Sequence, residues 1–371
     1  MLGLNRIKAC NRHFRRCLIA LIALFLPSFA MAGEAPETYG DMDTAAFDGL
    51  EKLTYNLQDF SDRYKATLEI GDQDDVFRPG IISVLDKKTG KTLMRVQSDE
   101  LVLDTDAKSN EVTTNVHELP YGEQSVLIYE DFNFDGIKDL AVMDGQNSCY
   151  HGPSFQVFLG TSEGFAHSDS FTELAQNYCG MFSVDTKNRQ LQTMTKDGCC
   201  MHEMATYSVE KGEPVMQTQT VVDQTGASGL IEETDSTNKD GKMVSTTRTV
   251  WSDDDERQIL LAFQLAPSGK RVVLFKPGAS DGVYYAAVDG QDNVGLVYPQ
   301  TEGEQFSYDS TRHVLSFTRG DTTYRIMGDD QGTPTGMQVE IRGKMTDLKL
   351  QAGGRKGSLL KVAQALQANP G

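Results

Sequence analysis

Short apolar runs separated by turn residues recur along most of this chain of 371 residues. Three examples are GIISVLDKKTGKTLMRV (80–96), VLSFTRGDTTYRIM (314–327) and MQVEIRGKMTDLKL (337–350). The turns combine glycine with charged or polar residues, as in Arg319-Gly320-Asp321 and Arg342-Gly343-Lys344. This pattern is typical of antiparallel hairpins. It restricts the chain to a fold that is mainly β.

Helical spacing of apolar residues occurs near the two ends of this β region. A C-terminal helix is predicted from Ser358 to Gln367. An N-terminal helix is predicted within TAAFDGLEKLTYNL, capped by Asp43 or Thr44, from the spacing of Phe47, Leu50, Leu53 and Leu57. With short strands between these helices, the chain is expected to form either a β-propeller-like fold or two consecutive antiparallel β domains.

The first 32 residues have the composition of an export signal. Five basic residues precede the apolar run CLIALIALFLPSF (Cys17 to Phe29), and Ala30-Met31-Ala32 fits the rule for a cleavage site. The run is short for a membrane span, and the cleavage point has no cysteine for a lipid anchor. We expect cleavage after Ala32 and a periplasmic protein without a membrane span.

A polar interval divides the rest of the chain. DQTGASGLIEETDSTNKDGK (Asp223 to Lys242) is either a linker or a hairpin that turns at 238–241. We place a boundary near Thr220. The chain would then comprise the signal (1–32), a β domain (33–220) and a C-terminal antiparallel β region (221–371).

The net charge bears on the choice of partner. Removing the signal lowers Lys+Arg from 35 to 30 and leaves Asp+Glu at 53, so the net charge changes from −18 to −23. Such acidity argues against nucleic acid and anionic lipid, and it favours cations or a basic protein. The charge is equally compatible with a role only in keeping an exported protein in solution.

The stretch EDFNFDGIKDL concentrates carboxylates in one loop. Its spacing is Asp131-x-Asn133-x-Asp135-Gly136-x-x-Asp139, in which the Ile137 carbonyl takes the seventh position. Oxygen atoms at positions 1, 3, 5, 7 and 9 suit Ca²⁺. The twelfth position is Val142 instead of the usual Glu, so Asp139, Asp144 or a distant residue would complete the site. The flanking runs SVLIY and LAVM predict that two strands hold this loop.

Two other interpretations of the acidic stretch fit its spacing less well. It could be a solvated Asn/Asp-rich turn, although a turn does not need the full ligand spacing. It could also be a catalytic carboxylate pair, but its oxygens already fit a metal. We therefore predict a structural Ca²⁺ site and no catalytic residue.

Four cysteines remain after the signal: Cys149, Cys179, Cys199 and Cys200. In an exported chain they are expected to form disulfides, with three possible connectivities. We favour a core pairing of Cys149 with Cys179 and one of the vicinal cysteines, and a strained Cys199–Cys200 bridge is also possible. The Cys-x-His spacings at His151 and His202 alternatively suit zinc or copper.

The segment from Gln124 to Val215 resembles a known family of exported bacterial proteins. The resemblance rests on VLIYEDFNFDGIKDLAVMDG and on YHGPSFQVFLGTSEGFAHSDSFTEL with its strand-rich continuation. Members of that family are periplasmic immunity proteins that inhibit a peptidoglycan-cleaving, lysozyme-like effector of a bacterial secretion system. The resemblance implies a β-propeller-like fold and an EF-hand-like Ca²⁺ loop at Asp131, Asn133, Asp135 and Asp139.

The loop is also similar to the Ca²⁺ loops of FG-GAP repeats in integrin-type propellers. Two features depart from the immunity family. This chain has no lipoprotein cysteine, and its C-terminal β region is long.

These observations favour a binding protein over an enzyme. The chain has no P-loop, no G-x-S-x-G, no H-E-x-x-H and no dinucleotide-binding fingerprint. The expected function is inhibition of a basic cell-wall hydrolase. The alternatives are an FG-GAP-like structural or adhesive module, or a metal-dependent enzyme that uses the Cys/His cluster.

Overall fold

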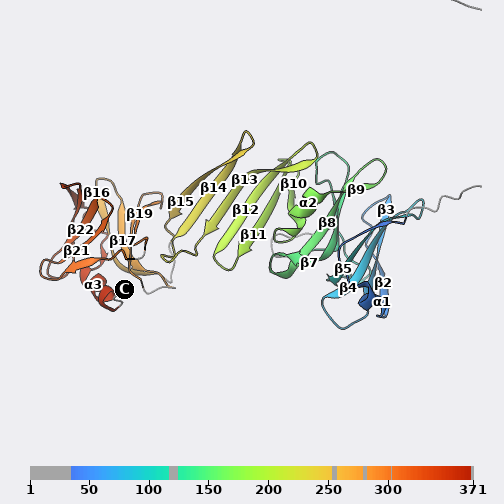
Figure 1. Ribbon diagram of the computed structural model, residues 1–371, viewed down its shortest axis with the longest axis horizontal. Coiled ribbons are helices and arrows are strands. Elements are labelled where there is room, and N and C mark those ends of the chain that lie inside the picture. The colour runs from blue at the N-terminus through green and yellow to red at the C-terminus, as the bar shows by residue number, and fades with distance from the viewer. Residues whose placement is uncertain (1–34, 117–123, 253–256, 279–281, 302, 369–371) are drawn as a thin grey trace, which may run out of the picture. The chain divides into compact units, whose positions relative to one another are not determined.

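The computed structural model describes residues 35–116, 124–252, 257–278, 282–301 and 303–368, and the predicted signal of residues 1–32 lies outside them. Four sheets and a few short helices make up the described chain (Figure 1). Most neighbouring strands are antiparallel and consecutive in sequence. The prediction of a mainly β fold with short helices near both ends is confirmed.

The first sheet contains five strands and one parallel pair, which joins β1 to β5. Its order is β1 (Glu37–Tyr39), β5 (Thr92–Leu101), β4 (Arg78–Asp86), β3 (Tyr64–Gly71) and β2 (Lys52–Asn56). The β4–β5 hairpin is the one that the sequence predicts at 80–96. Burial alternates along β3 and β4, so one face of this sheet is buried.

The N-terminal helix is shorter than predicted. Helix α1 (Thr44–Asp48) is capped by Asp43, whose side chain accepts from the N–H groups of Ala45 and Ala46. It ends at Gly49, and the residues from Lys52 to Asn56 form β2. Leu53 and Tyr55 alternate with exposed residues and pack on the core, so strand pairing with β3 overrides the helical spacing.

The second sheet follows directly in sequence. Its strands are β6 (Leu127–Glu130), β7 (Asp139–Ser148), β8 (Gly152–Gly160) and β9 (Phe165–His167). A 3₁₀ turn, η1 (Cys149–His151), joins β7 to β8, and helix α2 (Asp169–Gln176) follows β9. The Ser168 side chain caps α2.

The third sheet is a meander of six strands: β10 (Ser183–Asp185), β11 (Gln190–Asp197), β12 (Met201–Glu210), β13 (Glu213–Asp223), β14 (Ile231–Lys239) and β15 (Lys242–Val250). Thr220, where we placed a domain boundary, lies inside β13 and pairs with both Met204 and Asp235. The polar interval forms the end of β13, a loop and the β14–β15 hairpin, because its Thr and Ser side chains pair across strands.

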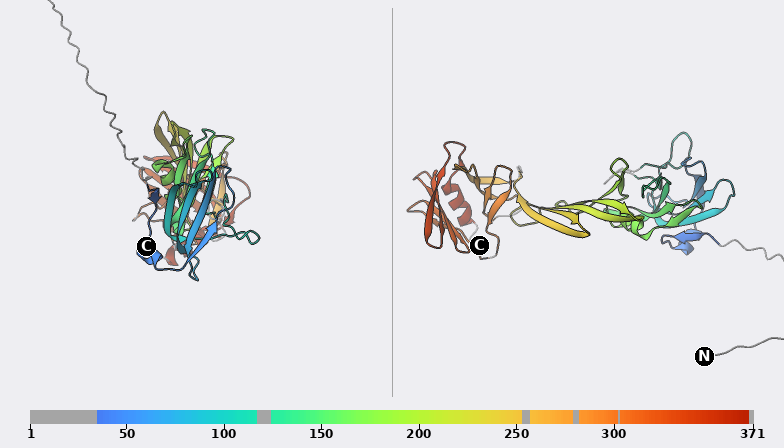
Figure 2. Two further views of the ribbon diagram at one scale, coloured as in Figure 1. Left: turned by 90° about the vertical axis from the view of Figure 1, so that its right-hand side faces the viewer. Right: turned by 90° about the horizontal axis from the view of Figure 1, so that it is seen from above.

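The fourth sheet contains the C-terminal strands β16 (Gln258–Ala266), β17 (Arg271–Lys276), β18 (Tyr284–Val288), β19 (Val294–Tyr298), β20 (Ser307–Asp309), β21 (Val314–Arg319), β22 (Thr322–Gly328), β23 (Pro334–Ile341), β24 (Lys344–Leu350) and β25 (Lys356–Gly357). The hairpins β21–β22 and β23–β24 are those that the sequence predicts. Helix α3 (Leu359–Ala368) packs against these strands (Figure 2), with Leu359 and Val362 fully buried. It confirms the predicted C-terminal helix.

The buried core nearest the acidic loop is shared by three sheets. It joins side chains of β3, β4 and β5 to those of β6, β7 and β8, and adds Phe171 of α2 and Leu191 of β11. The C-terminal strands have separate apolar clusters. Among the helices that the structure describes, none is long and apolar enough to cross a membrane.

Candidate functional site

The acidic stretch forms the connection of the β6–β7 hairpin. Glu130 at the end of β6 lies opposite Asp139 at the start of β7, so residues 131–138 make up the loop. Leu127, Ile128 and Leu140 beside it are fully buried. The strand–loop–strand arrangement agrees with the apolar flanks seen in the sequence.

The polar side chains of this loop point back to its own backbone. The two carboxylate oxygens of Asp131 accept from the N–H groups of Asp135 (3.2 Å) and Gly136 (2.9 Å). Asn133 Oδ1 also accepts from the N–H of Asp135 at 2.9 Å, and Asp135 Oδ1 accepts from the N–H of Ile137 at 2.7 Å. The oxygens at positions 1, 3 and 5 are therefore held on the inside of one turn.

Two phenylalanines fix the loop to the core. Phe132 and Phe134 alternate with the polar residues and are buried, and the Phe132 ring meets Phe182 edge-on at 5.4 Å between centroids. The backbone turns sharply here, with φ of +61° at Phe134 and +91° at Gly136. Glycine adopts such a φ without strain, which explains its place at position 6.

Asp139 is buried and closes the loop. Its Oδ2 accepts from the N–H groups of Phe132 (2.7 Å) and Asn133 (3.3 Å), and its Oδ1 accepts from the N–H of Gly160 at 2.7 Å. Burial raises the pKa of Asp139 to about 6, although the hydrogen bonds from Gly160 and Phe132 act in the opposite direction. Both oxygens thus bind the backbone of two neighbouring segments, β8 and the loop start.

The loop geometry determines which oxygen atoms could coordinate a cation. Within the described residues, no three His, Cys, Asp or Glu side chains come together as a metal-binding group. A cation in this loop would rely on the two carboxylates of Asp131 and Asp135, the amide oxygen of Asn133 and the carbonyl of Ile137. Such an all-oxygen set of carboxylate, amide and carbonyl groups fits Ca²⁺ and does not fit a soft metal.

Two residues support the loop from outside the motif. Arg189, just before β11, donates from Nη2 to the carbonyl of Phe134 at 2.8 Å, and its guanidinium lies 5.3 Å from the Phe134 ring centroid. A Cβ on Gly160 would come within 2.3 Å of the Lys138 carbonyl, so only glycine allows β8 to approach the loop this closely. Sequence reasoning missed both residues, because neither is near the motif in the chain.

The four cysteines among the described residues all form disulfides, as expected for an exported chain. Cys149 pairs with Cys179, and both belong to the set of three favoured for the core pairing; Cys199 pairs with Cys200, the vicinal bridge that the sequence left possible. The sulfur atoms are therefore not thiolate ligands. His151 lies beside Glu100, with 3.4 Å between Nε2 and Oε2. The Cys-x-His spacings do not build a zinc or copper site.

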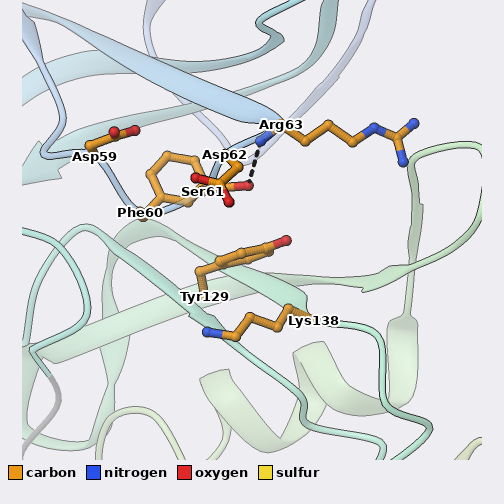
Figure 3. A pocket seen from close by; sticks show the side chains of 7 residues that line it. All are labelled: Asp59, Phe60, Ser61, Asp62, Arg63, Tyr129 and Lys138. Atoms are coloured by element: carbon orange, nitrogen blue, oxygen red, sulfur yellow. Dashed lines mark hydrogen bonds between the residues drawn. The ribbon is translucent and has the colours of Figure 1, made fainter.

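An open groove of about 450 Å³ adjoins the loop through Lys138 (Figure 3). The Tyr129 ring lies between Phe60, which meets it edge-on at 5.4 Å, and Lys138, whose Nζ is 5.2 Å from its centroid. Asp59 forms an ion pair with Lys87. The Tyr129 ring in the groove therefore has contacts within this chain on two sides.

Comparisons with known proteins identify no family. No family model matches, and no curated protein matches. Among solved structures, a Xanthomonas protein related to a type IV secretion system is 18% identical, with 54% of this chain and 94% of that chain covered and a TM-score of 0.41. A prolyl endopeptidase is 7% identical (81% and 42% covered, TM-score 0.23), and an oligogalacturonate lyase in complex with manganese is 11% identical (82% and 86% covered, TM-score 0.20). These TM-scores are too low to transfer a fold or a function.

Proposed function

We propose that this chain is an exported, calcium-binding β protein that acts by binding another protein. The observation that carries the proposal is the inward arrangement of the Asp131, Asn133 and Asp135 oxygens on the β6–β7 loop. The spacing of these residues matches the ligand order of a Ca²⁺ loop. The arrangement in the structure keeps their oxygens on one side of the turn.

The cation would have a structural role. Ca²⁺ would be held by Asp131, Asn133, Asp135 and the Ile137 carbonyl, while Asp139 would hold the loop against β8. The carboxylates of Asp131 and Asp135 face one turn and repel each other, and a bound cation removes that repulsion. The loop in turn joins two buried strands, so its order affects the core around Phe132 and Phe134.

Calcium titration calorimetry on the chain without residues 1–32 tests this proposal. We expect binding with a stoichiometry near one that Asp135→Ala abolishes. Asp106→Ala is a matched control, because Asp106 also accepts from two backbone N–H groups but belongs to an exposed turn with a single aspartate. Equal calcium binding by Asp135→Ala and the unaltered chain would reject the loop as the site.

The proposed partner is a basic cell-wall hydrolase of the lysozyme type, which the chain would inhibit. The net charge of −23 expected after signal removal complements a basic enzyme and accelerates its association. The resemblance of residues 124–215 to exported immunity proteins points to the same class of partner. No residue of this chain is proposed to be catalytic.

Inhibition can be measured by the clearing of a peptidoglycan suspension by purified basic lysozymes of several families. We expect the chain to slow clearing by at least one of them, and the inhibition to weaken at high salt because exposed charges are screened. If every lysozyme of the panel clears the suspension at its unaltered rate, the inhibitor role is wrong, whatever the calcium result.

A second candidate is a structural or adhesive module. It is favoured by the position of the loop between two strands, as in FG-GAP repeats, instead of between two helices. This alternative expects calcium binding and attachment to surfaces or matrix, with no inhibition of any hydrolase. The clearing assay therefore separates the two candidates.

A further inference from the structure

Two exposed loops place apolar side chains next to each other. Val76 and Phe77, in the loop between β3 and β4, are 66% and 37% exposed, and Tyr150 in η1 is 59% exposed. The Phe77 ring meets His151, the residue after Tyr150, edge-on at 4.9 Å between centroids. We call Val76, Phe77, Tyr150 and His151 together the Tyr150 surface.

The backbone of this surface is unusual. Tyr150 and His151 have φ values of +53° and +59°, a left-handed conformation that residues other than glycine rarely adopt. Such conformations persist where the surrounding structure enforces them, and they concentrate at functional sites. Here two occur in succession, in the short turn between β7 and β8.

Several contacts hold the turn in this conformation. Cys149, directly before Tyr150, is bonded to Cys179, and its N–H donates to the carbonyl of Tyr178. The Tyr150 hydroxyl accepts from the N–H of Gly198 at the tip of the β11–β12 hairpin. His151 is held between Phe77 and Glu100. The exposed rings are therefore fixed before any partner arrives, which lowers the entropy cost of binding.

Carboxylates share the Phe77 loop and one of them contacts His151. The loop that carries Phe77 also contains Asp72, Asp74 and Asp75, all exposed, and Glu100 lies against His151. Lys196, with its Nζ 4.6 Å from the Tyr150 ring centroid, and Arg78, which follows Phe77, are the cations near them. Rigid aromatic side chains inside a charged rim are the usual anatomy of a protein-binding site.

We propose that the Tyr150 surface docks a basic protein, with Phe77 and Tyr150 as the buried contacts and Asp74, Asp75 and Glu100 facing its Lys and Arg side chains. The inference rests on the proposed function, because the partner it fits is the basic lysozyme-type hydrolase. It locates the contact away from the calcium loop. The loop then supports the fold, and the Tyr150 surface binds.

The test measures binding of the chain to immobilised basic lysozymes, in excess calcium, by biolayer interferometry. Tyr150→Ala and Phe77→Ala are each expected to weaken binding by roughly tenfold to a hundredfold, as for central aromatic residues of an interface. Asp74→Asn combined with Asp75→Asn is expected to slow association and to reduce its salt dependence. Ile341→Ala is the matched control, since Ile341 is 53% exposed but lies on β23.

The calcium-dependent shift in melting temperature serves as the folding check for each variant. If Tyr150→Ala loses that shift, Phe77→Ala, which leaves η1 unchanged, decides the test. Binding by the unaltered chain together with affinities within twofold for both aromatic variants would reject the Tyr150 surface and leave the proposed function standing. If no lysozyme of the panel binds the unaltered chain, both the inhibitor role and this surface are rejected.

Discussion

Aspartates occupy two kinds of loop in this chain, and their environments have opposite effects. In the turns at Asp86 and Asp106, a single carboxylate accepts from backbone N–H groups two and three residues ahead. Those hydrogen bonds lower the pKa of Asp86 and of Asp106. In the β6–β7 loop, burial raises the pKa of Asp139 to about 6.

At Asp139 the effect of desolvation on the pKa is larger than the effect of the hydrogen bonds, so the pKa is raised. In the two turns the hydrogen bonds have the larger effect, so the pKa is lowered. Asp139 accepts three backbone hydrogen bonds and its pKa is still raised, because its side chain is buried. In the single-aspartate turns the hydrogen bonds favour the ionised form, and at Asp86 the nearby guanidinium of Arg63 adds to that effect. The β6–β7 loop gathers carboxylates around a buried one, which is the situation in which a cation has most effect.

The largest effect is expected from Asp139→Ala. The substitution leaves the N–H groups of Phe132, Asn133 and Gly160 without their acceptor, and the destabilisation should reach roughly 3–5 kcal/mol. Urea unfolding in the presence of chelator measures it without a contribution from calcium. Asp106→Ala should cost much less than Asp139→Ala, since water replaces the lost acceptor. Equal losses for the two variants would remove the distinction between the loops.

Chelation is expected to have the next largest effect. Calcium that binds only the folded chain stabilises it by about 2.7 kcal/mol at a hundredfold excess over Kd. Chelator should therefore lower the Tm of the unaltered chain and of Asp106→Ala, and leave the Tm of Asp135→Ala unchanged. The same Tm with and without chelator for the unaltered chain would contradict a calcium site.

Alanine substitutions at two glycines can distinguish the effect of backbone strain on stability from an effect on calcium binding. Gly136 and Gly90 both have positive φ, +91° and +69°, and both face open space. Alanine at either position should cost about 1 kcal/mol of stability in chelator. Only Gly136→Ala should weaken calcium binding as well, which calorimetry would detect. A calcium affinity unaffected by Gly136→Ala would mean that the turn at position 6 does not shape the site.

The smallest effect concerns acid unfolding of the single-aspartate turns. The folded pKa of Asp86 and of Asp106 lies below the ordinary value of 3.8, so each turn stabilises the fold above pH 3.8 and loses that contribution as the pH falls through the lower folded value. Asp86→Ala and Asp106→Ala should each make the unfolding free energy fall less steeply below pH 3.8. Urea unfolding at a series of acidic pH values in chelator measures the slope. Slopes equal to that of the unaltered chain would show that these hydrogen bonds do not persist in solution.

Local patterns in the sequence determined the strands, the hairpin turns and the order of oxygen-bearing side chains in the β6–β7 loop. These features depend on residues two to nine positions apart. The hairpins that turn at Gly320 and Gly343 are examples. The helix predicted beyond Asp48 failed where pairing with β3, a contact outside the local window, was decisive.

Only the tertiary structure decided how the site is supported. The burial of Asp139, the approach of Gly160 and the contact from Arg189 join segments that are 21 to 55 residues apart in the chain. The same holds for the contact between Phe77 and His151, which lie in connections of two different sheets. Such contacts arise from core packing, which sums over many weak interactions and leaves no short pattern in the sequence.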